Sequence, residues 1–391
     1  MRGAEPFTIA VPDAVIEGIL ARVRAYPWAS LPDAGGWSAG TGLAFLRDLC
    51  AYWVDGYDWR RAEAALNRWP GYRAEAGGLR LHAVHAPGTG PDPLPLLLTH
   101  GWPGSFVEFL GVAERLADPG RFGDDPADAF HVVVPSLPGY GFSDRPPRPI
   151  GPRTVARHLD ILVRETLGYP RYLAQGGDWG SAVSAWLGYD HGADRGGACA
   201  GLHLNMVSTL SAERAARTEE ERAWQAGHDG RQRLEGAYMR QQSTRPQTLA
   251  YAMMDSPVGV AAWIVEKFAA WSDLPRDRAG DPDLLARYTR DELLTNVMIY
   301  LVTESFATST WLYKGLFEEK PVSFPAGTRV EVPVGVAAFR DPVFVPPPRS
   351  LAERAYNVVR WTEMPRGGHF AALEAPDLFV EDVRAFARTL R

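Results

Sequence analysis

The sequence predicts an α/β fold with a mostly parallel central sheet flanked by helices. Short apolar runs closed by Gly or Pro recur from Leu79 onward, and helical patterns separate them. Several of these runs are continuous rather than alternating, as expected of parallel strands that are covered on both faces. Strands that alternate with helices in this way indicate the α/β class.

The first seventy-odd residues are predicted to be helical. Apolar residues recur at helical spacing from Val15 to Val23, after the helix-start pair Pro12-Asp13. A second helical segment spans residues 41–69. The predicted strands that follow are residues 79–86, 94–101, 130–139, 171–178, 201–207, 330–339 and 358–365.

Helical patterns rich in charged and aromatic residues interrupt the strands from about Ser208 to Lys320. An insertion of this kind is expected to fold as a lid over the C-terminal edge of the sheet, where ligands bind in such folds. The predicted organisation is a helical extension that wraps the core (1–75), a first core part (76–207), a helical cap (208–320) and a second core part (321–391).

Composition excludes several classes of function. The 391 residues are 46% hydrophobic and carry a net charge of -6 without long Lys/Arg blocks, so no nucleic-acid partner is expected. Cys50 and Cys199 have neither disulfide-framework nor metal-site spacing and are predicted to be small, buried or half-buried residues. Without a signal-like N-terminus or a run of 18 apolar residues, no membrane span and a cytoplasmic location are expected.

The segment GGDWGS, residues 176–181, has the small-x-nucleophile-x-small pattern of a nucleophile elbow, with Asp178 in the position of the nucleophile. Small residues allow the sharp turn between strand and helix that exposes such a side chain. The alternative is a plain turn in which Asp178 caps the next helix.

A second motif, THGWPGS, follows the apolar run that ends at Leu98. Its turn can direct backbone N–H groups towards the elbow, so the N–H groups of Trp102 and Trp179 are the predicted oxyanion hole. His100 in this motif is interpreted as a structural residue that holds the loop.

A third motif supplies the predicted base. His369 follows a Gly-Gly pair on a loop after the last strand pattern, and it comes after Asp178 in chain order, as the base of such elbows does. The carboxylate that orients it is predicted to be Asp341, just past the end of a strand. The alternative for Asp341 is a turn-capping role before Pro342.

These motifs resemble those of the microsomal-type epoxide hydrolases, an α/β-hydrolase family with an N-terminal helical extension and a helical lid. The resemblance covers nearly the whole chain: FTIAVPDAVIEGILARV and GYDWRRAEAALNRWPGY resemble the extension, and HGWPGS, GGDWGS, DSPVGVAAWIVEKFAAW, LLTNVMIYL and RGGHFAALEAP resemble core and lid motifs. It implies that Asp178 is the nucleophile, that His369 is the base, and that Tyr238 and Tyr313 are the lid tyrosines that hold the epoxide oxygen.

The chain departs from that family at one position. The family's usual acidic residue falls near Val343, whereas this sequence has FRDPVF, so the role is predicted to have moved by two residues to Asp341.

An aspartate nucleophile suits an sp3 electrophile, because a carboxylate is ionised at neutral pH and can attack without losing a proton. The expected cycle opens an epoxide, forms an ester on Asp178 and hydrolyses it with water activated by His369, without a metal or cofactor. The expected partners are a small-molecule epoxide and water, and a homodimer is left open.

Two other functions stay open at this point. One is a haloalkane dehalogenase-like hydrolase, which uses the same aspartate elbow, and the other is a catalytically silent homologue that binds an apolar ligand. The lid aromatics Trp263, Trp271 and Trp311 are consistent with a roomy apolar pocket or with the core of the lid.

Overall fold

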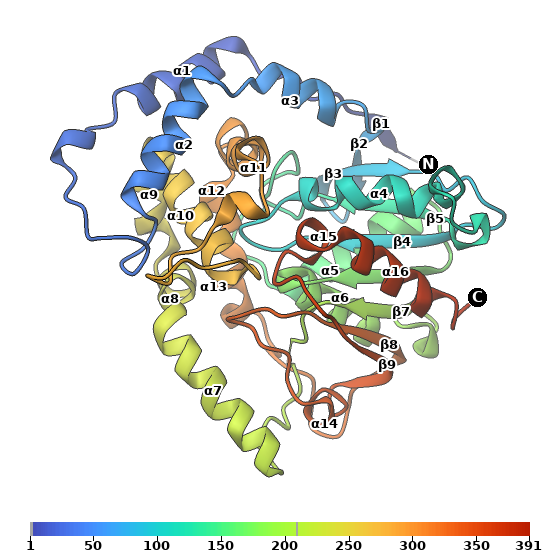
Figure 1. Cartoon of the computed structure of the whole chain (residues 1–391). Helices are drawn as coiled ribbons and strands as arrows, with labels where there is room; N and C mark the ends of the chain where they lie inside the picture. Colours follow the sequence, from blue (N-terminus) through green and yellow to red (C-terminus); the bar gives the residue numbers. More distant parts are fainter. Residues whose placement is uncertain (1–2, 209) are drawn as a thin grey trace.

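The computed structural model describes residues 3–208 and 210–391. Within these residues, one sheet of nine strands is covered by helices on both faces, and a group of helices lies at one end of it (Figure 1). The strands are β1 (Ala4–Pro6), β2 (Gly71–Ala76), β3 (Leu79–Ala86), β4 (Leu94–Thr99), β5 (Phe130–Pro135), β6 (Tyr172–Gly176), β7 (Cys199–Leu204), β8 (Val330–Ala338) and β9 (Tyr356–Glu363).

The strand order is β1-β2-β3-β5-β4-β6-β7-β8-β9. Pairing is antiparallel from β1 to β5 through β2 and β3, and parallel from β5 to β9. In the parallel part, Thr99 at the end of β4 pairs with Gly176 at the end of β6. The loops that follow these two strands therefore start side by side at the C-terminal edge of the sheet.

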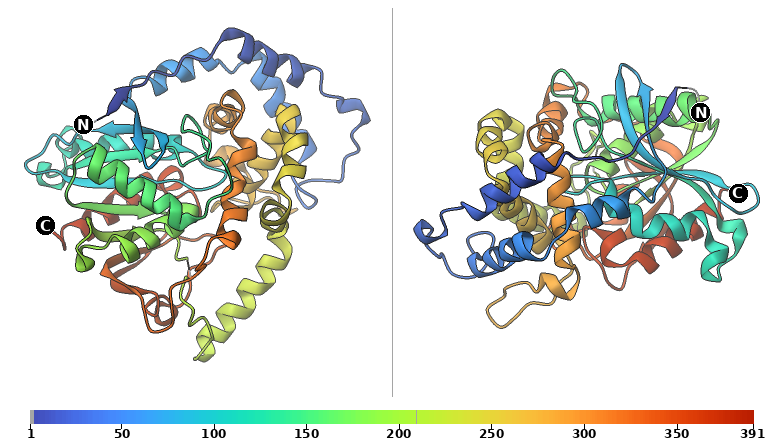
Figure 2. Two further views of the ribbon diagram at one scale, coloured as in Figure 1. Left: turned by 180° about the vertical axis from the view of Figure 1, so that it is seen from behind. Right: turned by 90° about the horizontal axis from the view of Figure 1, so that it is seen from above.

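All the predicted strands are present, and the predicted α/β-hydrolase fold is confirmed. Every residue of β6 and β7 is buried, because helices cover both faces of the parallel sheet. The core helices are α4 (Leu110–Ala117), α5 (Pro152–Ile161), α6 (Asp178–Asp190), α14 (Arg349–Ala352), α15 (Ala371–Glu374) and α16 (Pro376–Ala387). Figures 1 and 2 show α4 and α16 on one face of the sheet and α5 and α6 on the other.

The N-terminal region contains the predicted helices and also two strands that were not predicted. β1 and β2 extend the sheet beyond β3 with mostly half-buried or exposed residues, so they lack the apolar run that reveals a buried strand. The second predicted helical segment is divided into α2 (Leu43–Asp55) and α3 (Trp59–Leu66). The division follows Gly56, and Asp58 caps α3 by accepting a hydrogen bond from the backbone N–H of Arg60.

The first helix, α1 (Asp13–Arg24), α2 and α3 form an arch that passes over the helices inserted after β7 (Figure 1). The Thr41 hydroxyl donates a hydrogen bond of 2.7 Å to the carbonyl of Ala262, and the Tyr52 hydroxyl donates one of 2.7 Å to Asp291. Polar contacts therefore tie the N-terminal helices to the inserted ones.

The inserted helices lie between β7 and β8, where the sequence pattern places a lid. They are α7 (Glu219–Glu235), α8 (Ala237–Thr244), α9 (Pro246–Asp255), α10 (Pro257–Trp271), α11 (Arg290–Val302), α12 (Phe306–Ser309) and α13 (Trp311–Glu318). Capping boxes start two of them, with Thr218 and Glu221 on α7 and Thr289 and Glu292 on α11. These helices stand at the end of the sheet where β4 and β6 finish (Figure 1).

No single helix in the described part of the chain is long and apolar enough to cross a membrane, although the sharply bent pair α9 and α10 passes the same test by length and composition. Cys50 and Cys199 are both buried free thiols, as predicted.

Candidate active site

The turn between β6 and α6 presents Asp178 at the first position of the helix. Its φ of 46° lies in the left-handed region, which is uncommon for a residue other than glycine and is typical of strained functional turns. A Cβ atom on Gly180 would lie 1.9 Å from the carbonyl oxygen of Thr99, so only glycine lets the turn pack against the end of β4. Asp178 thus stands where the dipole of α6 favours negative charge.

The loop after β4 directs a backbone donor at this carboxylate. The Trp102 N–H donates a hydrogen bond of 2.8 Å to Asp178 Oδ1, and a Cβ atom on Gly101 would lie 2.2 Å from the same oxygen. Within the described residues, the Trp179 N–H makes no hydrogen bond to Asp178, and its role as the second oxyanion donor stays a prediction.

His100 fixes the shape of this loop. The backbone N–H of Leu137 donates to His100 Nε2 at 3.2 Å, so the ring proton is on Nδ1, which lies 3.0 Å from the carbonyl oxygen of Gly101. Burial lowers the pKa of His100 to about 4, and the ring is therefore neutral. These contacts agree with its interpretation as a structural histidine.

Helix α11 holds the same loop from the other side. The Asn296 side-chain amide donates a hydrogen bond of 2.8 Å to the carbonyl of Pro103, and the Tyr300 hydroxyl donates one of 2.6 Å to the carbonyl of Gly104. All of these groups are buried, so the loop carbonyls are satisfied and the direction of the Trp102 N–H is fixed.

His369 lies between two carboxylates. Its Nδ1 is 2.6 Å from Asp341 Oδ2, and its Nε2 is 3.5 Å from Asp178 Oδ2. Burial acts to lower the pKa of His369, but the charges of Asp341 and Asp178 outweigh this effect and raise the pKa to about 10. The imidazole is therefore held in its protonated form while both carboxylates are charged.

Asp341 belongs to a tight turn after β8. Its Oδ1 accepts hydrogen bonds from the backbone N–H groups of Val343 at 2.9 Å and Phe344 at 2.7 Å, which leaves Oδ2 for His369. The Val343 side chain is buried among apolar residues. The structure thus brings Asp341, and not position 343, to the histidine.

The two lid tyrosines reach the same place from α8 and α13. The rings of Tyr238 and Tyr313 lie 5.8 Å apart, Tyr238 stacks on Trp102 at 5.3 Å, and Tyr313 meets the edge of Trp179 at 4.7 Å. In the described structure the buried Tyr313 hydroxyl has no hydrogen-bond partner. Burial, reinforced by the Asp178 charge, raises the pKa of both phenols well above 10, so both stay protonated.

A cavity of about 150 Å³ lies between Asp178 and the two tyrosines. Its remaining wall is largely apolar and is made by Trp179, Ala182, Met206, Ser208, Leu210, Met239, Ser243, Leu316, Phe317 and Phe344. An apolar cavity with a few convergent polar groups is typical of a small-molecule site.

The three lid tryptophans singled out in the sequence are not among the residues that line this cavity. Trp271 is fully buried and packs on His369 at 4.7 Å, and Trp263 donates a hydrogen bond of 3.0 Å to the Gln242 side chain. Trp271 therefore packs against the histidine, and Trp263 packs within the lid. Trp311 lies at the start of α13.

Sequence reasoning missed a buried acid close to this site. Glu108 is 9% exposed and lines a second, smaller cavity together with Asp178 and His369. The sequence feature that could have revealed Glu108 is its position as a single acidic residue inside the apolar stretch FVEFLGVA, three positions after the HGWPGS motif.

Comparisons with known proteins identify the family of this chain. Residues 4–109 match the family described as "Epoxide hydrolase N terminus", and residues 95–218 match "alpha/beta hydrolase fold". The chain is 31% identical to epoxide hydrolase 1 of Sus scrofa, covering 97% of this chain and 88% of that protein. It is 41% identical to a Stigmatella aurantiaca protein that is provisionally named an epoxide hydrolase, covering 100% of this chain and 86% of that protein.

Solved structures give the same result. The epoxide hydrolase of Aspergillus niger superposes with a TM-score of 0.83 at 31% identity, covering 100% of this chain and 97% of that chain. The juvenile hormone epoxide hydrolase of the silkworm Bombyx mori gives a TM-score of 0.82 at 29% identity, with coverage of 100% and 94%. The chain therefore belongs to the epoxide hydrolase family, as an enzyme with the α/β-hydrolase fold.

Proposed function

We propose that this enzyme converts an apolar or aromatic epoxide to a vicinal diol through an alkyl ester on Asp178. The observation that carries the proposal is the position of this carboxylate. One side of Asp178 faces a cavity with two protonated phenols, and Asp178 Oδ2 lies 3.5 Å from His369 Nε2, a nitrogen whose ring is oriented by Asp341.

In the first step, an oxygen of Asp178 attacks an epoxide carbon and the C–O bond of the strained ring breaks. The departing oxygen takes a proton from Tyr238 or Tyr313. Both phenols suit this role, because burial keeps their pKa well above 10 and a strongly basic alkoxide can still remove the proton.

In the second step, water attacks the carbonyl carbon of the ester and gives a proton to His369. Ester formation removes the negative charge of Asp178, which is one of the two charges that raise the pKa of His369 in the free enzyme. The histidine therefore releases its proton to solvent at the ester stage, so that it can act as a base, and takes one back from solvent when the Asp178 carboxylate forms again. The Trp102 N–H donates to Asp178 Oδ1 at 2.8 Å, which supports a role for it in stabilising the oxyanion.

The lining of the cavity supports an apolar substrate. Its polar side-chain groups are the Asp178 carboxylate, the two tyrosine hydroxyls, the hydroxyls of Ser208 and Ser243, and the Trp179 indole N–H. The other lining side chains are apolar. Hydrophobic contact with side chains such as Leu316 and Phe344 would hold the rest of the epoxide.

Oxygen labelling tests this proposal. A single turnover of styrene oxide in water enriched in oxygen-18, with enzyme in excess, should place one label in Asp178 and none in the diol. The reason is that the new diol oxygen comes from the carboxylate. Mass spectrometry of the diol and of the peptide that contains Asp178 measures both. A labelled diol from the first turnover would show direct attack by water and exclude the ester.

The variant Asp178→Asn should abolish diol formation, since a neutral amide does not displace at an sp3 carbon. The exposed Asp255 on α9 provides the matched control, and Asp255→Asn should retain activity. Chloride release from a chloroalkane of similar size, measured beside styrene oxide, distinguishes this activity from dehalogenation.

A further inference from the structure

Asp178 separates two cavities. The cavity with Tyr238 and Tyr313 lies on one side, and a rear chamber with His369 and Glu108 lies on the other. Among the residues that the structure describes, Asp178 alone lines both. The face of the carboxylate that meets an epoxide is therefore different from the face that meets the base.

The rear chamber has the size and the polarity of a site for one water molecule. Its volume is about 10 Å³, close to the ~10–15 Å³ that a single buried water needs. Asp178, His100 and Trp102 contribute to its lining, and three further polar side chains face it: His369 and Thr99, whose Nε2 and Oγ1 atoms have no hydrogen-bond partner in the described structure, and Glu108. A buried water typically requires two to four such partners.

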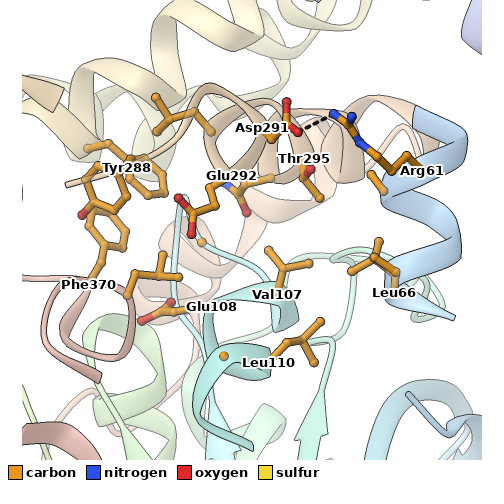
Figure 3. Close-up of a pocket in the computed structure, with 18 of the residues that line it drawn as sticks. Arg61, Leu66, Val107, Glu108, Leu110, Tyr288, Asp291, Glu292, Thr295 and Phe370 are labelled. Atoms are coloured by element: carbon orange, nitrogen blue, oxygen red, sulfur yellow. Dashed lines mark hydrogen bonds and ion pairs between the residues drawn. The ribbon is translucent and has the colours of Figure 1, made fainter. Parts of the chain in front are cut away.

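Glu108 also borders a larger cavity of about 330 Å³ that lies beneath the N-terminal extension. Figure 3 shows Glu108 beside Phe370 at one side of this cavity and Leu66 of α3 at the opposite side. Gly104, Glu108 and Phe370 line both this cavity and the rear chamber. The carboxyl group of Glu108 thus stands at the junction between them.

We propose that Glu108 positions the hydrolytic water in the rear chamber, and that this water enters from the larger cavity. Water and epoxide then approach Asp178 from opposite sides. This inference rests on the ester mechanism proposed above and adds a positioning residue to its second step.

The geometry defines what each group does. One hydrogen of the water is held by a carboxyl oxygen of Glu108, and the other faces His369 Nε2, so that the oxygen lone pair points at the carbonyl carbon of the Asp178 ester. A bond forms between the water oxygen and that carbon while His369 takes the proton. The bond from the carbon to the diol oxygen then breaks, and His369 returns the proton to that oxygen.

The remaining proton of the attacking water leaves as the Asp178 carboxylate forms again, and it restores the phenol that was deprotonated in the first step. The sum is one epoxide and one water giving one diol. Glu108 makes and breaks only hydrogen bonds in this sequence.

The charges around Glu108 favour this role at the ester stage. Burial raises the pKa of Glu108 to about 8, the neighbouring His369 imidazolium opposes this shift, and the charges of Asp178 and Glu374 add to it. The other titratable residues that line the larger cavity are Tyr288, Asp58, Arg61, Asp291 and Glu292. When Asp178 becomes a neutral ester, one of the charges that keep Glu108 protonated is removed, and its carboxylate becomes a better acceptor.

The test separates the two chemical steps. Rapid mixing with styrene oxide, quenching, and intact-protein mass spectrometry give the rate at which the ester forms and the rate at which it decays. Glu108→Leu should form the ester at the wild-type rate and hydrolyse it roughly 10- to 100-fold more slowly, because the water is no longer oriented. An unchanged rate of ester formation also reports that the variant is folded.

Two further variants distinguish positioning from a structural role. Glu108→Gln keeps an acceptor oxygen of the same reach and should keep most of the wild-type hydrolysis rate. Glu108→Ala opens space next to the larger cavity, so added formate should accelerate decay of its ester and have no effect on the wild-type enzyme. The control Glu114→Leu, at a half-buried glutamate on α4 that pairs with Arg121, should change neither step.

The proposal is overturned if Glu108→Leu and Glu108→Ala hydrolyse the ester at the wild-type rate. It is also overturned if Glu108→Gln is as slow as Glu108→Leu and formate does not accelerate Glu108→Ala. A wild-type enzyme that turns over styrene oxide without forming any ester contradicts the proposed mechanism itself, and with it this inference.

Discussion

Asp341 uses one oxygen for its own turn and the other for His369. Oδ1 accepts the N–H groups of Val343 and Phe344, while Oδ2 lies 2.6 Å from His369 Nδ1. Because the turn is fixed by its own backbone, the carboxylate has little freedom to move away from the imidazole. This contact orients the ring and stabilises its protonated form.

The variant Asp341→Asn should therefore form the Asp178 ester rapidly and then stall. The orienting acid acts on the imidazolium that arises when water is deprotonated, so its loss impairs the second step and not the first. An enzyme mass increased by one substrate, measured seconds after mixing with styrene oxide, would show this accumulation.

His369→Gln should stall at the same stage more severely, since it removes the proposed base itself. Asp255→Asn should turn over as wild type does. Full turnover by Asp341→Asn, without accumulation of ester, would assign the orienting role to another group.

The charge state of His369 should depend on Asp178. In the free enzyme, the two neighbouring carboxylates raise the pKa of His369 to about 10 against the opposing effect of burial. Asp178→Asn removes one of these charges, as ester formation does, so the histidine should titrate at a lower pH in this variant than in the wild type. Nitrogen-15 NMR of the imidazole across a pH series measures the shift.

The pKa of His369 should fall in Asp178→Asn because a carboxylate stabilises the imidazolium and a neutral amide does not. Asp255→Asn should leave the pKa of His369 unchanged. Equal pKa values in Asp178→Asn and wild type would mean that ester formation does not prepare His369 to act as a base.

Replacing the lid phenols should slow ester formation. Tyr238→Phe and Tyr313→Phe each remove a hydroxyl that we propose donates to the epoxide oxygen, and the loss of an acid contribution typically reduces a rate by about 10²- to 10⁴-fold. Hydrolysis of the ester should be nearly unchanged, because the phenols act on the leaving oxygen. Stopped single-turnover reactions separate the two rates.

The exposed Tyr251 on α9 offers the matched control, and Tyr251→Phe should affect neither step. If the double variant of Tyr238 and Tyr313 forms the ester at the wild-type rate, the phenols do not supply the proton.

The elbow should tolerate no side chain at position 180. The Cβ atom of Gly180→Ala would lie 1.9 Å from the Thr99 carbonyl oxygen, so either β4 or the start of α6 must move. Overpacking of this kind lowers the free energy of unfolding by about 1–3 kcal/mol, and urea denaturation measures it.

Gly18 on α1 is the control for the same chemical change. A Cβ atom there meets no atom within 4 Å, and alanine in a helix interior is favoured over glycine by roughly 0.5–1 kcal/mol, so Gly18→Ala should stabilise the protein. A Gly180→Ala variant as stable as wild type would show that the elbow can relax at little cost.

The sequence by itself determined the parallel strands and the residues that follow them. Strands buried on both faces are mostly apolar, so β4, β6 and the buried second half of β8 could be located from their composition, and the loops after them carry Trp102, Asp178 and Asp341. The edge strands β1 and β2 escaped prediction because partly exposed strands need no apolar run. Gly56 divides one predicted helical segment into two, and the helical patterns on both sides of it conceal this break in the sequence.

Only the tertiary structure decided which carboxyl groups surround His369. Asp341 is 28 residues away from His369 along the chain. Its Oδ2 contacts the imidazole only because its Oδ1 accepts a backbone N–H group of the following turn and so fixes the direction of the carboxylate. Glu108 comes from the segment before α4 and enters the rear chamber because α11 holds the preceding loop. Such contacts depend on distances between side chains that no local pattern encodes, since they arise when separate elements pack together.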